Sequence, residues 1–82
     1  MKAVRILYMA SSGSSDPTRA SIPFHLAVNG SVERGHDVGI VLAGDATEFL
    51  QPDLREAAEG LGLPPLRELL TKARQHAVPV YV

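Results

Sequence analysis

The side chains best placed to do chemistry fall in two short polar segments, each directly after an apolar run. The first segment follows residues 2–10 and the second follows residues 37–43. Hydroxyls and backbone N–H groups just ahead of a helix are suited to holding an anion or another polar ligand. The ligand-binding candidates are therefore Ser11, Ser12, Gly13, Gly44 and Asp45.

Other interpretations of these two segments stay open. Neither matches a phosphate-binding fingerprint, because no Gly-Lys-Ser/Thr follows and the G-x-G-x-x-G spacing is absent. Asp16 would repel a phosphate, and both segments also suit solvated turns in which Asp16 and Asp45 cap helices. The same two carboxylates could alternatively face each other across one edge of a sheet as an acid/base pair.

The residue types exclude several other kinds of site. The chain has no cysteine, so the 82 residues contain no thiolate nucleophile, disulfide or thiolate zinc ligand. His25, His36 and His76 are far apart and do not form a spacing typical of metal ligands. We therefore assign no catalytic residue, no metal site and no cofactor.

The elements that must position these residues alternate between strands and helices. Residues 2–10, 37–43 and 78–82 have strand character, and the middle run is nearly continuous in apolar residues, as in a strand covered on both faces. A helix is expected from Asp16 or Pro17 to Arg34, with Gly35 as its left-handed end. The order β-α-β-α-α-β predicts right-handed crossovers and a parallel sheet in a three-layer α/β fold.

The first helix is apolar on two sides. Ala20, Phe24, Ala27, Val28 and Val32 share one face on a 3.6-residue wheel. A second patch lies roughly opposite, and in so short a chain we expect another subunit to cover it. The interface candidates are Ile22, His25, Leu26 and Asn29.

The second half of the chain predicts shorter helices. Asp45 and Glu48 have the spacing of a capping box, and Pro52 favours the start of a further turn. Beyond Pro65, a helical stripe comprises Leu66, Leu69, Leu70, Ala73 and Ala77. On the other side of that helix, Glu68 and Lys72 are spaced for an i, i+4 ion pair.

Composition narrows the class of protein. Eight basic and nine acidic residues give a net charge of −1, which argues against a nucleic-acid partner. No apolar stretch is long enough to span a bilayer and no secretory signal is evident, so we expect no membrane partner and a cytoplasmic location. Residues 1–82 are expected to form one domain that corresponds to the front part of a larger one.

Several segments together resemble the DsrE/DsrF-like family, which includes the YchN-like proteins. They are SSGSSDPTRASIPFHLAVNG, VLAGDATEFL, GLGLPPLRELL and HAVPVYV, in that order over essentially the whole chain. The resemblance implies a flavodoxin-like three-layer α/β fold and a homo-oligomer, often a trimer or hexamer. It also implies a sulfur-relay (sulfurtransferase-like) role in which family members carry persulfide sulfur and work with sulfur-relay partners.

One departure from the family limits what the resemblance implies about activity. In many relatives the strand that resembles Val78–Val82 leads into a loop with a cysteine, and no residue here matches it. We expect that cysteine to lie beyond residue 82 or to be lost, so catalysis by these 82 residues is not expected. The alternatives are a non-catalytic oligomeric subunit and a small-anion-binding module.

Overall fold

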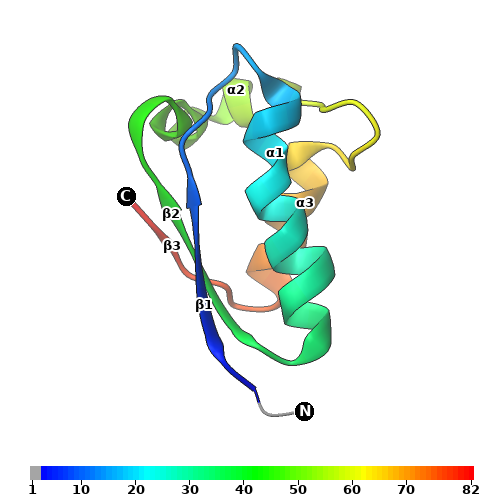
Figure 1. The fold of residues 1–82 in the computed structure, drawn as a ribbon. Coiled ribbons are helices and arrows are strands. Elements are labelled where there is room, and N and C mark those ends of the chain that lie inside the picture. Colours follow the sequence, from blue (N-terminus) through cyan, green and yellow to red (C-terminus); the bar gives the residue numbers. More distant parts are fainter. Residues whose placement is uncertain (1–2) are drawn as a thin grey trace.

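A computed structural model describes residues 3–82 and contains a three-stranded parallel sheet (Figure 1). The strands are β1 (Arg5–Ala10), β2 (Asp37–Leu42) and β3 (Val80–Tyr81), with β2 in the centre. Arg5 pairs with Asp37 at one end of the β1–β2 ladder and Ala10 with Leu42 at the other. The parallel sheet predicted from the sequence is confirmed, with a third strand of two residues. Lys2, expected to begin the first strand, lies outside the described residues.

The long first helix forms as three consecutive segments. Helix α1 (Pro17–Leu26) continues as a π-helical turn, Ala27–Ser31, and a 3₁₀ turn, Val32–Arg34. The predicted cap is confirmed, since the Asp16 carboxylate accepts a hydrogen bond from the backbone N–H of Arg19 at 3.1 Å. Gly35 ends the helix with a φ of +80°, a conformation that glycine adopts without steric cost.

The chain between β2 and β3 contains a 3₁₀ helix, Gly44–Leu50, followed by α2 (Pro52–Ala57) and α3 (Leu66–Gln75). Helices beginning near Pro52 and Pro65 are confirmed. The predicted capping box is wrong, because the 3₁₀ helix begins after Ala43 without a side-chain cap. The Glu48 carboxylate instead accepts hydrogen bonds from Ser14, in the loop that follows β1.

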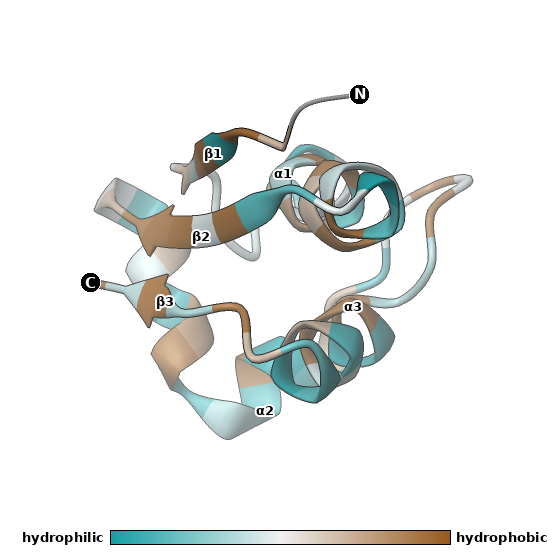
Figure 2. Cartoon of the chain, turned by 90° about the horizontal axis from the view of Figure 1, so that it is seen from below, coloured by the Kyte–Doolittle hydropathy of each residue, from teal (hydrophilic) through white to brown (hydrophobic). Residues whose placement is uncertain are grey.

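The hydrophobic core lies between one face of the sheet and the helices. Figure 2 shows α1 and α3 side by side on that face, and α1 contacts both β1 and α3. Alternation along β2 directs every second side chain toward the helices. The core comprises Val38, Ile40 and Leu42 from β2, Ala20, Phe24, Ala27 and Val28 from the first helix, and Leu66, Leu69 and Ala73 from α3.

The layers differ from the expectation in one respect. In residues 3–82 the helices pack against one face of the sheet, and the opposite face is open (Figures 1 and 2). The element order also includes the π-helical and 3₁₀ segments, which the predicted β-α-β-α-α-β order lacks. The structure is therefore a mixed α/β fold built on a parallel sheet, with two layers in its described part.

Candidate functional site

The two polar segments singled out from the sequence lie next to each other at the carboxyl edge of the sheet. Strands β1 and β2 end level with each other, and the backbone N–H of Ala43 donates to the carbonyl of Ala10 at 2.9 Å. Consequently the loop with Ser11, Ser12 and Gly13 runs beside the loop with Gly44 and Asp45. In open parallel sheets, ligands bind beyond this edge.

Gly13 is the point of closest approach between the two loops. A Cβ atom built on Gly13 would lie 2.6 Å from the backbone carbonyl oxygen of Asp45 and 3.0 Å from Oε1 of Glu48. A real Cβ does not approach a backbone atom so closely, so the site accepts only glycine without a shift of the backbone. Gly13 is accordingly buried, and its role is to let the loops pack.

Glu48 joins the two loops and was not expected to do so. Its Oε2 accepts hydrogen bonds from the backbone N–H of Ser14 at 3.2 Å and from the Ser14 hydroxyl at 2.5 Å. These bonds hold the pKa of the Glu48 carboxyl below its ordinary value. The backbone N–H of Ser14, which could bind an anion at this edge, therefore already donates to the Glu48 carboxylate. Asp16 and Asp45 lie nearby in the chain and would repel an anion.

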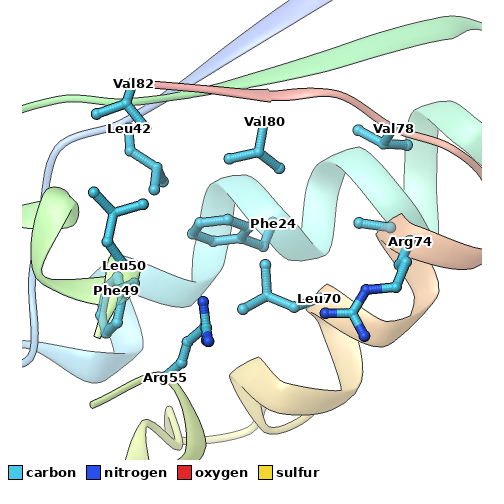
Figure 3. A pocket seen from close by; sticks show the side chains of 11 residues that line it. Phe24, Leu42, Phe49, Leu50, Arg55, Leu70, Arg74, Val78, Val80 and Val82 are labelled. Atoms are coloured by element: carbon cyan, nitrogen blue, oxygen red, sulfur yellow. The ribbon is translucent and has the colours of Figure 1, made fainter. Parts of the chain in front are cut away.

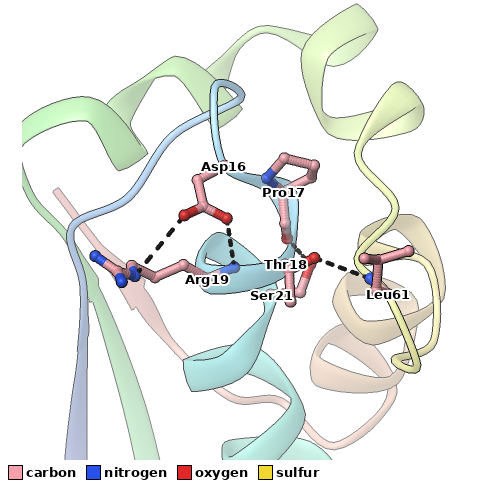
Figure 4. A network of polar contacts seen from close by, with 6 residues as sticks. All are labelled: Asp16, Pro17, Thr18, Arg19, Ser21 and Leu61. Carbon is pink, nitrogen blue, oxygen red and sulfur yellow. Dashed lines mark hydrogen bonds and ion pairs between the residues drawn. The ribbon is translucent and has the colours of Figure 1, made fainter.

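The polar groups at the start of α1 form hydrogen bonds and an ion pair with neighbouring residues (Figure 4). The Arg19 side chain lies 3.8 Å from the Asp16 carboxylate, and the Ser21 hydroxyl donates to the carbonyl of Pro17 at 2.7 Å. Thr18 Oγ1 accepts a hydrogen bond from the backbone N–H of Leu61 at 2.9 Å. Asp16 is thus engaged in capping and in an ion pair, and Thr18 anchors the loop between α2 and α3.

The predicted interface residues on the first helix divide into two groups. Ile22 and Leu26 are 43% and 48% exposed and form an apolar surface on the outer side of α1. His25 and Asn29 are only half-buried and share a hydrogen bond of 3.1 Å between Nδ1 and Nδ2. The outer surface of α1 therefore retains exposed apolar side chains beside a polar pair.

Lys72 ties that polar pair to α3. Its Nζ donates to Oδ1 of Asn29 at 2.5 Å and also forms an ion pair with Glu33. The hydrogen bond and charge of Lys72 lower the pKa of the Glu33 carboxyl. Lys72 does not pair with Glu68 as its i, i+4 spacing suggested, because the long-range partners on the first helix hold it.

The open face of the sheet is a second candidate surface, which the sequence did not reveal. Leu7, Met9 and Tyr81 are 63%, 66% and 53% exposed there, although strand positions of this kind usually pack against a second layer. The side chains of Leu7 and Tyr81 lie over Gly39, whose missing Cβ makes room for them. A hollow of about 430 Å³, with Arg5, Asp37 and Pro79 at its rim, opens on this face.

Residues 3–82 lack two other kinds of feature. No group of three or more histidine, aspartate or glutamate side chains gathers there as metal ligands would. Likewise, no helix in that range is long and apolar enough to cross a bilayer. Comparison of the chain with protein-family models, curated proteins and solved structures found no match in any of the three.

Proposed function

We propose that this chain acts by assembly, as a non-catalytic subunit of a DsrE/DsrF-like, sulfur-relay type of protein. The observation that carries the proposal is the open sheet face with Leu7, Met9 and Tyr81 exposed. Exposed apolar patches rimmed by polar residues mark interaction sites in globular proteins. A domain of 82 residues also buries a comparatively small fraction of its surface, so covering this face would add to a small core.

A second copy of the chain is the occupant that fits this face. Symmetric dimers use the same patch on both subunits, so the patch must be complementary to itself. Met9 is exposed on the face that also carries the hollow around Gly39, so Met9 of each copy could enter the hollow of the other. At one end of the face Arg5 and Asp37 form an ion pair at 3.2 Å, so no uncompensated charge repels a second copy.

The sulfur-relay part of the proposal rests on the resemblance of the sequence segments. Sulfur transfer through a persulfide needs a thiolate, and these 82 residues contain no cysteine. In the proposed role the chain supplies a folded α/β subunit, and a thiol on a partner protein carries the sulfur. In a flavodoxin-like three-layer arrangement a second layer of helices covers this face of the sheet. In the proposed assembly the second copy covers it.

Light scattering coupled to size-exclusion chromatography tests the assembly. The wild-type chain is expected to elute at a multiple of its 8.8 kDa mass, and Met9→Glu as a monomer with an unchanged circular dichroism spectrum. Leu61→Glu is the matched control, because Leu61 is 87% exposed on a loop remote from the face. A wild-type monomer at micromolar concentration, or a Met9→Glu variant that still assembles, would overturn the proposal.

Persulfide labelling tests the sulfur-relay role separately. The tagged chain is recovered from cells together with its partners, and protein persulfides are labelled and identified by mass. A labelled thiol on a protein recovered with the tagged chain, and absent when an untagged chain is used, supports the role. Assemblies that contain no labelled thiol contradict the sulfur-relay role, and the assembly measurement is unaffected by that result.

A further inference from the structure

The helix-covered side of the sheet contains a cavity, separate from the two polar loops and from the open face. It lies between strands β2 and β3 on one side and α2 and α3 on the other, and its volume is about 300 Å³ (Figure 3). Phe24 of α1, with Leu42 at the end of β2 and Val80 of β3, gives it an apolar lining. The cavity lies beneath the carboxyl ends of β2 and β3, the end of a parallel sheet at which ligands bind.

Two arginines are the charged residues of this apolar lining. Arg55 comes from α2, and Arg74 comes from α3 one turn after Leu70. In Figure 3 their side chains lie on either side of Leu70, across the cavity from Val80 and Val82. No aspartate, glutamate or histidine lines the cavity. Its charge is therefore positive and its walls are apolar.

Neither arginine has an acidic partner within residues 3–82. Arg5, Arg19 and Arg67 each form an ion pair with a carboxylate, whereas Arg34, which does not line the cavity, is exposed and forms none within residues 3–82. A guanidinium presents a planar set of N–H donors that matches a carboxylate in a bidentate geometry. Arg74 is exposed and Arg55 is half-buried, and within residues 3–82 no side-chain carboxylate pairs with either, so the two groups are complementary to an anion brought by a ligand.

We propose that this cavity binds a small amphipathic carboxylate, with its apolar body against Phe24 and its carboxylate held by Arg55 and Arg74. The volume is at the lower end of the range for small-molecule sites, so the apolar body is short. A cation of the same shape would be repelled by the two guanidinium groups. A fully polar anion such as phosphate would leave the apolar lining without contacts.

Octanoate is the probe, with octanol and octylamine as comparators that share its chain and differ in charge. Amide chemical-shift perturbation of the labelled chain is expected to show saturable octanoate binding, centred on residues of α2, α3 and β3. Octanol is expected to bind more weakly, and octylamine not at all. Arg55→Gln and Arg74→Gln should each weaken octanoate binding about tenfold, which corresponds to about 1.4 kcal/mol.

Three variants test whether octanoate binds in this cavity, and not through overall charge or at the opposite face of the sheet. Arg34→Gln removes an exposed arginine that does not line the cavity and should bind octanoate like the wild type. Val80→Phe adds volume at a lining position that is 41% exposed, without changing charge, and should abolish binding while the folded spectrum persists. Met9→Glu changes the opposite face of the sheet and should leave binding intact, so the cavity and the assembly proposal can fail independently.

Several results would overturn the inference. Absence of saturable octanoate binding by the wild type is one, and equal binding of octanoate and octylamine is another. An effect of Arg34→Gln as large as that of Arg55→Gln and Arg74→Gln would show that overall charge, and not the cavity, attracts the probe. Shift changes confined to the open sheet face would place the ligand elsewhere.

Discussion

The Glu48 carboxylate accepts hydrogen bonds from both the backbone N–H and the hydroxyl of Ser14, across 34 residues of sequence. This contact fastens the loop after β1 to the 3₁₀ helix after β2, at the edge of the sheet where ligands of α/β proteins bind. Here the side chain of the protein itself occupies the donors. At the β1–β2 part of this edge an internal carboxylate therefore holds the Ser14 donors, whereas the arginine-lined cavity lies beneath the carboxyl ends of β2 and β3.

The Ser14–Glu48 contact predicts a pH-dependent stability. Hydrogen bonds from Ser14 lower the Glu48 pKa in the folded state, so the contact stabilises the fold above the ordinary carboxyl pKa. The contribution is lost as the pH falls through the lowered folded pKa. Glu48→Gln should therefore lower the melting temperature at pH 7 and have little effect at pH 3, as measured by thermal denaturation.

A matched variant and a titration check this prediction. Glu56→Gln removes an exposed carboxylate whose side chain makes no hydrogen bond or ion pair within residues 3–82, so its effect should not vary in this way. In Ser14→Ala, the Glu48 pKa measured by NMR should rise toward its ordinary value. A Glu48→Gln effect of the same size at both pH values would contradict the assignment.

Substitution by alanine is expected to change the free energy of unfolding in opposite directions at Gly13 and Gly30. A Cβ on Gly13 would collide with the backbone of Asp45, so Gly13→Ala should destabilise the fold by about 1–3 kcal/mol. Nothing lies within 4 Å of a Cβ on Gly30, in the π-helical turn, so Gly30→Ala should stabilise it by about 0.4–1 kcal/mol. Urea unfolding measures both, and a Gly13→Ala variant as stable as the wild type would refute the close packing of the two loops.

Local features were predicted well from the sequence because their causes are local. Asp16 and Pro17 set the start of the first helix, and Gly35 sets its end with a positive φ. The apolar stripe predicted for α3 is confirmed at Leu66, Leu69 and Ala73, which are buried, but is wrong at Ala77, which lies beyond the helix end at Gln75 and is exposed. The π-helical turn at Ala27–Ser31 was not predicted, because apolar periodicity over a single turn does not distinguish π-helical from α-helical hydrogen bonding.

Contacts between distant residues were predicted poorly, and the candidate site depended on them. Glu48 has the spacing of a capping box with Asp45, yet its partner is Ser14. The nearly continuous apolar run of β2 predicts cover on both of its faces, but a sequence pattern does not say what supplies that cover. For this reason the open face with Leu7 and Met9 emerged only from the structure.

The contacts of Lys72 predict that the packing of α3 on the end of the first helix contributes to stability. Lys72→Met keeps the aliphatic stem and removes the bonds to Asn29 and Glu33, so the melting temperature should fall by a few degrees at pH 7. The Glu33 pKa, lowered mainly by its hydrogen bond with Lys72, should rise toward its ordinary value. The difference in stability should shrink as the pH falls and Glu33 becomes protonated.

NMR titration of the Glu33 carboxyl and thermal denaturation measure these two effects. Arg34→Met is the control, because it removes one positive charge from the residue next to Glu33 and leaves the Lys72 contacts in place. If both variants changed the Glu33 pKa equally, the shift would arise from general charge and not from the Lys72 hydrogen bond.

The hydroxyl groups of Tyr8 and Ser31 predict a measurable coupling free energy between β1 and the π-helical turn. They share a hydrogen bond of 2.7 Å, and Ser31 is buried. Tyr8→Phe and Ser31→Ala each leave the other hydroxyl without this partner, so each should cost about 1 kcal/mol. The double variant should cost less than the two single variants together, by about 0.5–1.5 kcal/mol.

Urea unfolding of the four proteins at pH 7 gives this coupling directly. Ser15→Ala is the control, because Ser15 is exposed and its hydroxyl makes no hydrogen bond within residues 3–82. Its effect should stay within about 0.5 kcal/mol, as for other surface substitutions. Strictly additive effects of Tyr8→Phe and Ser31→Ala would mean that the hydrogen bond does not stabilise the packing of the first helix on β1.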